Sequence, residues 1–178
     1  MRKLTTSELN RLTIDEFKLS KRLSVVVVLD HVRSGHNVGS VFRTCDAFGI
    51  EKLYLCGITP QPPNREVLKT ALGSSDSVEW RHFRETKSAL EELRSEGYEI
   101  VFAEHTSESI SLQQFFPSAE KKFVFVFGNE VEGINSELLH LADHIIEIPQ
   151  FGTKHSFNIA VAAGIVLWDF YLKFSPGI

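Results

Sequence analysis

Three clusters of polar side chains carry the residue types in this sequence that are best suited to chemistry. The first is His-Asn-Val-Gly at 36–39 with Arg43, the second is Gly-Asn-Glu at 128–130, and the third lies within 149–158. Amides, carboxylates, hydroxyls and a guanidinium are groups that orient a substrate, move a proton or bind a phosphate. The spacing therefore predicts a polar site assembled from three separate segments.

The runs that precede these clusters have the composition of buried parallel strands. Almost every position in these runs is Val, Leu, Ile or Phe, and the runs are residues 25–29, 123–127 and 145–148. They lack the alternation of apolar and polar residues that is typical of a strand with one solvent-exposed face. Ligands of open α/β sheets bind beyond the carboxyl ends of such strands. We therefore expect the three clusters to meet in one pocket at that edge of the sheet.

The remaining pattern alternates strands with helices, which is typical of an α/β fold. Asn37 is the expected N-cap of a helix that stops at Gly49. Further strands are expected at 53–55, 78–83 and 98–103, and further helices at 85–96 and 156–173. This order predicts a single-domain parallel sheet flanked by helices.

The first 22 residues differ in charge from the rest of the chain. Thr5 and Thr13 each precede a glutamate by three residues, the spacing of a capping box, so two short helices are expected. This segment has a net charge of +3, within a total of −4. Such an arm suits contact with RNA phosphates, and a solvated helix face is the alternative. We expect an N-terminal arm at 1–22, a domain at 23–174 and a short tail at 175–178.

The sequence lacks the motifs of several common protein classes. Gly128 opens a segment with the glycine spacing of a P-loop, but Ile134 stands where the phosphate-binding lysine is required. Dinucleotide-binding glycines and a serine nucleophile elbow do not occur, and no histidine pair has metal-ligand spacing. Cys45 and Cys56 sit in apolar patterns, and no apolar run spans a bilayer. We expect a cytoplasmic protein with neither a metal nor a membrane partner.

Taken together and in order, the three clusters resemble the motifs of the SpoU family of RNA 2′-O-ribose methyltransferases, within the SPOUT class. The family's Asn-x-Gly followed by arginine matches 37–43, and its strand ending in Gly-x-Glu matches 128–130. Its Ile-Pro followed by Ser-Leu-Asn at the start of a helix matches 148–158. The resemblance covers about residues 25–172.

This resemblance implies a deep C-terminal trefoil knot with S-adenosyl-L-methionine held between the knot loops. The residues implied to contact this cofactor are Glu104, Gly128, Ile148 and Phe157. Phe157 replaces the usual leucine, and Gln150 replaces the usual methionine. Both positions line the cofactor pocket in relatives, so these departures bear on the shape of the pocket. The implied substrate is RNA, either tRNA or rRNA.

The same resemblance implies five catalytic residues on the substrate side of the pocket, which are Asn37, Arg43, Glu130, Ser156 and Asn158. A guanidinium is rarely free to accept a proton, so Arg43 is interpreted as a clamp on the target phosphate. Asn37 hydrogen-bonds the ribose or fixes Arg43. Glu130 either orients these two side chains or accepts the proton of the ribose hydroxyl.

Other interpretations stay open at this point. Ser156 and Asn158 each have the residue type of an ordinary helix cap. His36 and His155 flank the clusters and are alternative bases, because histidine titrates near neutrality. Two alternatives for the chain as a whole are a catalytically silent RNA-binding or ribosome-assembly module and an enzyme that methylates a base nitrogen. The intact asparagine, arginine and glutamate positions favour ribose methylation.

The last predicted helix carries apolar residues on more than one side. They are Ile159, Ala160, Ala162, Ala163, Val166, Leu167, Phe170 and Tyr171. A helix of this kind is buried from two sides, either within its own chain or between subunits. Together with the resemblance, this pattern predicts a homodimer.

Overall fold

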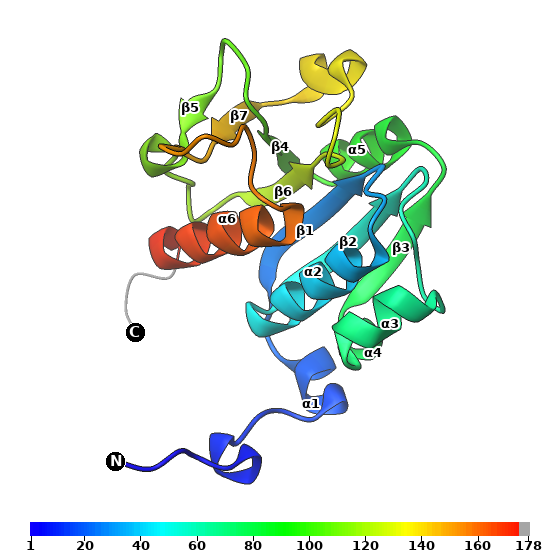
Figure 1. The fold of residues 1–178 in the computed structure, drawn as a ribbon, viewed down its shortest axis with the longest axis vertical. Helices are drawn as coiled ribbons and strands as arrows, with labels where there is room; N and C mark the ends of the chain where they lie inside the picture. Colours follow the sequence, from blue (N-terminus) through cyan, green and yellow to red (C-terminus); the bar gives the residue numbers. More distant parts are fainter. Residues whose placement is uncertain (175–178) are drawn as a thin grey trace.

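The computed structural model describes residues 1–174 and contains a seven-stranded parallel sheet with helices on both faces (Figure 1). The strand order is β3-β2-β1-β6-β4-β7-β5, and every neighbouring pair is parallel. The strands are β1 Leu23–Asp30, β2 Ile50–Cys56, β3 Glu79–Phe83, β4 Tyr98–Ala103, β5 Ile110–Ser111, β6 Lys122–Phe127 and β7 His144–Glu147. The predicted α/β architecture is confirmed, and the knot stays a prediction from the resemblance.

Strand β1 shows why its sequence is apolar without alternation. Val25, Val27 and Leu29 point into the core on one face of the sheet, and Val26 and Val28 point into the core on the other. All five side chains are fully buried. Because helices cover both faces, each position of the strand needs an apolar side chain.

The helices divide between the two faces of the sheet. Figure 1 shows α2 and α6 side by side in front of the sheet and α5 behind it, and the two core clusters agree with this division. The helices are α1 Ile14–Leu19, α2 Gly35–Ala47, α3 Arg65–Ala71, α4 Ser74–Ser77, α5 Thr86–Ser95 and α6 Ile159–Phe174. Three 3-10 helices complete the described chain, η1 Thr6–Leu9, η2 Leu112–Gln114 and η3 Ser136–Leu141.

Helix α2 begins earlier than the sequence pattern predicted. Its N-cap is Ser34, whose hydroxyl accepts a hydrogen bond from the backbone N–H of Asn37 at 3.2 Å. The prediction of Asn37 as the N-cap was wrong, and residues 36–39 lie in the helix instead of a loop. Since the serine already satisfies the helix end, the side chain of Asn37 is left for other contacts. The predicted stop at Gly49 is confirmed, with φ of +61°.

Helix α3 was missed in the sequence, although Asn64 caps it by accepting hydrogen bonds from two backbone N–H groups. It packs closely against α2 at Gly39. A Cβ atom at Gly39 would lie 2.1 Å from Thr70 Oγ1 and 2.3 Å from the carbonyl oxygen of Val67. The glycine of the first polar cluster therefore sets the distance between these two helices.

The N-terminal arm contains the two short helices that the capping boxes predicted. Both boxes form, with Thr5 at the start of η1 and Thr13 at the start of α1. Helix α1 contacts α4, and the rest of the arm reaches away from the sheet (Figure 1). The predicted tail at 175–178 lies outside the described residues.

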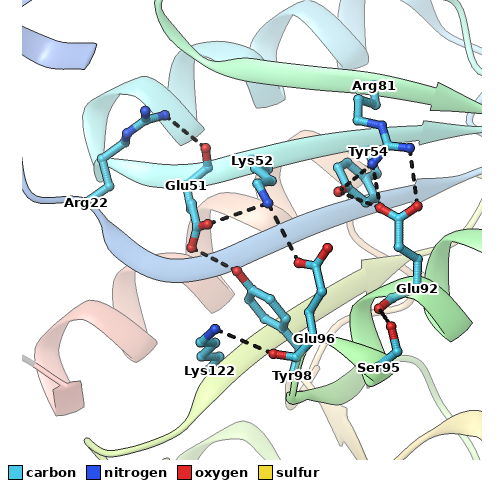
Figure 2. A network of polar contacts seen from close by, with 10 residues as sticks. All are labelled: Arg22, Glu51, Lys52, Tyr54, Arg81, Glu92, Ser95, Glu96, Tyr98 and Lys122. Carbon is cyan, nitrogen blue, oxygen red and sulfur yellow. Dashed lines mark hydrogen bonds and ion pairs between the residues drawn. The ribbon is translucent and has the colours of Figure 1, made fainter. Parts of the chain in front are cut away.

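A polar network joins α5 to the sheet, from the amino ends of β2 and β4 to the middle of β3 (Figure 2). The hydroxyl of Tyr98 donates to Glu51 at 2.9 Å, and Lys52 lies 3.7 Å from the same carboxylate. Burial and the Glu51 carboxylate raise the pKa of Tyr98. Arg81 on β3 pairs with Glu92 on α5. The network contains none of the predicted site residues, so its role is to hold the sheet and α5 together.

Gly39→Ala tests the close contact between α2 and α3. Alanine in a helix interior normally stabilises by roughly 0.5–1 kcal/mol relative to glycine. Here we expect a destabilisation of about 1–3 kcal/mol, because the methyl group would overlap the backbone of α3. Urea unfolding measures the change, with Gly152→Ala as the control because a Cβ there meets nothing within 4 Å. Equal stability of Gly39→Ala and the parent protein would contradict the close packing.

Candidate active site

A pocket of about 330 Å³ lies at the carboxyl ends of β4, β6 and β7. The four residues predicted to contact the cofactor all line it, and they are Glu104, Gly128, Ile148 and Phe157. Two residues of the predicted substrate side, Glu130 and Ser156, line it as well. The parallel sheet thus brings the second and third polar clusters to one cavity, in the place where open α/β sheets bind ligands.

The side chain of Asn37 joins the first cluster to the other two. Its Nδ2 atom donates a hydrogen bond to Glu130 Oε1 at 2.9 Å, and its Oδ1 atom accepts one from Asn158 Nδ2 at 3.1 Å. Asn158 also accepts from the backbone N–H of Ala160 at 3.0 Å and so caps α6. Segments that follow β1, β6 and β7 therefore meet at a single carboxamide.

Glu130 is held as an ionised carboxylate. Partial burial by itself would raise its pKa, but hydrogen bonds from Asn37 and from backbone N–H groups, including those of Arg33 and Ser34, lower the pKa below the ordinary value. The N–H of Arg33 lies 3.3 Å from Glu130 Oε2. A carboxylate with a lowered pKa is a weak proton acceptor. This arrangement favours an orienting role for Glu130 over the role of a base.

The wall of the pocket on the β4 side is a tightly folded loop. Glu104 accepts hydrogen bonds from the backbone N–H of Ile134 at 2.8 Å and from that of His105 at 2.9 Å. Gly133 has φ of +71°, and a Cβ atom there would lie 2.1 Å from Glu104 Oε2. A Cβ at Gly128 would lie 2.0 Å from the carbonyl carbon of Gly133. Both glycines are therefore needed for the loop to close onto Glu104.

Arg43 forms no hydrogen bond with Asn37, Glu130 or Asn158. It is exposed, and it follows Asn37 by six residues on α2. Exposed positions of α2 at 36, 43 and 47 share the face that points away from the sheet. Within residues 1–174, the guanidinium has no hydrogen-bond or ion-pair partner and is absent from the pocket lining. It is available to an external anion.

The sequence analysis named Gln150 but missed two side chains beside it in the pocket wall, His105 and Glu147. All three line the cavity, and His105 contacts both of the others. A signal was present, because His105 follows strand β4 and Glu147 interrupts an apolar strand. Neither position belonged to a recognised motif, so neither was singled out.

Three further observations concern the described part of the chain. Within it, no three His, Cys, Asp or Glu side chains gather as a metal site would require. Its helices are all too short or too polar to cross a bilayer. Cys45 and Cys56 are buried and unpaired, as predicted, and burial raises the pKa of both thiols.

Comparison with known proteins identifies the family of the chain. Residues 24–168 match the model of the SpoU rRNA Methylase family, and the protein therefore belongs to it. It is 28% identical over 152 residues to the tRNA (guanosine(18)-2′-O)-methyltransferase of Aquifex aeolicus, which covers 84% of this chain and 69% of the relative. It is 28% identical over 148 residues to the enzyme of the same name from Borreliella burgdorferi, covering 82% of this chain and 65% of the relative.

Solved structures give the same result for the fold. The AdoMet-bound rRNA methyltransferase from Sinorhizobium meliloti superposes with a TM-score of 0.77 at 29% identity, covering 86% of this chain and 59% of that one. The TrmH/SpoU tRNA-modifying enzyme of Aquifex aeolicus gives a TM-score of 0.77 at 29% identity, covering 90% and 81%. The chain thus spans less than two thirds of some relatives that it matches.

Asn37→Ala tests the carboxamide junction through the titration of Glu130. Asn37 supplies the largest of the contributions that lower the pKa of Glu130, so its removal should raise that pKa towards the ordinary value of 4.5. Carbon-13 NMR of glutamate-labelled protein follows the titration. Because the folded-state pKa is lowered, the stability contributed by Glu130 is full above its ordinary pKa and lost as the pH falls through the folded value.

The matched control is Asn64→Ala, which removes a cap from α3 and should leave the Glu130 titration unchanged. An unaltered Glu130 titration in Asn37→Ala would show that the junction does not hold the carboxylate.

Proposed function

We propose that this protein transfers a methyl group from S-adenosyl-L-methionine to a ribose 2′-hydroxyl of RNA. The observation that carries the proposal is the hydrogen-bonded junction of Asn37, Glu130 and Asn158 beside a pocket of about 330 Å³. Membership of the SpoU family and the names of the relatives support the reaction type. The substrate is an RNA of the tRNA or rRNA class, which the protein modifies in the cytoplasm.

The chemical character of the pocket fits this cofactor. Ile148 and Phe157 give apolar surface for a purine, and Glu104 and Glu147 add carboxylates. Among the described residues that line the pocket, there is no lysine or arginine. Such a lining favours a cationic ligand such as a sulfonium over an anionic one. When bound, the cofactor supplies an activated methyl group.

The residues around the pocket act mainly by positioning the RNA. Asn37 and Asn158 present amide groups that hydrogen-bond the ribose, and Glu130 fixes the orientation of Asn37. Arg43 binds the phosphate next to the target nucleotide, because its guanidinium is exposed and has no partner within residues 1–174. Ser156 borders the pocket and contacts the substrate or the loop. Well-positioned reactants recover about 7–11 kcal/mol of a barrier.

The N-terminal arm and the outer face of α6 define further partners in this proposal. The positive arm at 1–22 contacts RNA phosphates outside the pocket. The protein acts as a homodimer through α6, where Val161, Trp168 and Leu172 form one exposed apolar stripe. Several apolar residues expected at the interface are instead in the core, and Phe170 is only 1% exposed. The dimer surface is therefore the opposite side of the helix from Phe170.

Arg43→Ala and Gly128→Ala test the reaction and separate its two halves. Arg43→Ala should lose methyl transfer by at least about a hundredfold while its affinity for S-adenosylhomocysteine stays within a few fold, since the charge acts on RNA. Gly128→Ala should lose both, because its Cβ would displace the pocket loop. The measurement is single-turnover methylation of extracted RNA, with digestion and mass analysis of the nucleosides.

The parent protein must place the methyl group on ribose. A methyl group on a base, or full activity of Arg43→Ala, would contradict the assigned roles. Cofactor binding without any transfer to RNA would point to the silent RNA-binding module.

Trp168→Glu tests the proposed dimer. The side chain is 49% exposed in the isolated chain, so a charge there should leave the fold intact and prevent association through α6. In sedimentation, the parent protein should have about twice the chain mass of 20.1 kDa, and the variant should have the mass of a single chain. Leu68→Glu, an exposed position on α3, is the control and should remain dimeric. A monomeric parent protein at micromolar concentration would exclude the dimer.

A further inference from the structure

A chain of four polar side chains lies along the β7 side of the pocket. Ser109 Oγ lies 2.6 Å from Glu147 Oε2, and the same carboxylate oxygen lies 3.2 Å from His105 Nδ1. On the other side of the imidazole, His105 Nε2 lies 2.8 Å from Gln150 Nε2. His105, Glu147 and Gln150 also line the pocket. The chain therefore ends in a carboxamide at the cavity wall.

The chemistry of these groups fixes the direction of each hydrogen bond. Glu147 is an acceptor, since hydrogen bonds from Ser109 and His105 lower its pKa. An amide nitrogen can only donate, so His105 Nε2, which faces Gln150 Nε2, is the acceptor, and His105 Nδ1 donates to Glu147. Gln150 thus donates one N–H to His105. Its second N–H points towards the carbonyl oxygen of His155 at 3.5 Å. Only Oε1 of Gln150 is left to face a ligand.

The sheet order separates the strand that precedes Gln150 from the strands that precede Asn37 and Glu130. The junction of Asn37 and Glu130 follows β1 and β6, whereas Gln150 follows β7, two strands beyond β6 in the order β1-β6-β4-β7. In S-adenosylmethionine the sulfonium joins an adenosine arm to an amino-acid arm. With the sulfonium at the junction, one of these two arms extends towards Gln150.

The lining of the pocket favours one of the two arms on this side. The amino-acid arm ends in an ammonium and a carboxylate, and the carboxylate would have no lysine or arginine partner among the described lining residues. The adenine is neutral, and its faces suit the apolar surfaces of Ile148 and Phe157. Its exocyclic amine is a donor, which matches the free oxygen of Gln150.

We infer that Gln150 is a specificity-determining residue, whose Oε1 accepts a hydrogen bond from the exocyclic amine of the cofactor's adenine. His105 is a positioning residue that holds the carboxamide in this orientation, and Glu147 holds His105. The inference rests on the proposed function, because it assigns a part of the same cofactor to this side of the pocket. Methionine at position 150 would lack the acceptor.

The test compares the binding of two ligands by calorimetry. S-adenosylhomocysteine carries the amine, and S-inosylhomocysteine carries a carbonyl oxygen in its place. The parent protein should prefer the first by about tenfold to a hundredfold, because the second sets two acceptors against each other. Gln150→Met should reduce this preference to within about twofold, chiefly by weaker binding of S-adenosylhomocysteine.

Two substitutions at position 105 distinguish a role in positioning Gln150 from a general loss of structure. His105→Gln keeps one donor and one acceptor between Glu147 and Gln150, so it should retain most of the preference. His105→Leu removes both and should lose it, because the carboxamide of Gln150 is then free to turn. The ratio of the two affinities is the readout, since a general loss of structure would weaken both ligands alike. Thermal unfolding confirms that each variant is folded.

The outcomes distinguish failure of the inference from failure of the proposed function. Loss of the preference in Gln150→Met and His105→Leu, with retention in His105→Gln, supports the inference. Binding of S-adenosylhomocysteine with the same preference in the parent protein and in Gln150→Met would overturn it while leaving the proposed function intact. Absence of saturable binding of either ligand to the parent protein at millimolar concentration would overturn both.

Discussion

The site depends on one carboxamide, that of Asn37. It donates to Glu130 and accepts from Asn158, and so connects segments that follow three different strands. This contact is possible because β1 and β6 are adjacent and parallel, which brings the residues after them to the same edge of the sheet. It also requires Ser34 to cap α2, since an N-cap at Asn37 would bind the helix end instead. Local capping thus leaves the carboxamide of Asn37 free to form the junction.

Different kinds of contact hold the two ends of the pocket. At the junction, hydrogen bonds between side chains fix the orientation of the amide groups and of the carboxylate. On the β4 side, Glu104 binds the backbone of a loop that closes only because Gly128 and Gly133 lack a Cβ atom. The polar network around Tyr98 and Glu51 holds the opposite edge of the sheet (Figure 2).

Much of the fold follows from the sequence, because buried parallel strands leave a clear apolar pattern and the glycines at 49 and 97 stop helices. Six of the nine predicted site residues line the pocket, whereas Asn37, Arg43 and Asn158 lie outside its lining. The short helix α3 was missed because seven residues give little periodic signal. The start of α2 was misplaced because Ser34 and Asn37 are both good caps. The link between His105 and Gln150 joins residues 45 positions apart, a separation that no local pattern reveals.

A crystal structure of the protein with S-adenosylhomocysteine tests the central claim most directly. We predict density in the pocket between the loops after β6 and β7, with the sulfur atom facing the junction of Asn37 and Glu130. Density elsewhere on the molecule, or a sulfur atom turned away from that junction, would contradict the proposed arrangement of cofactor and substrate.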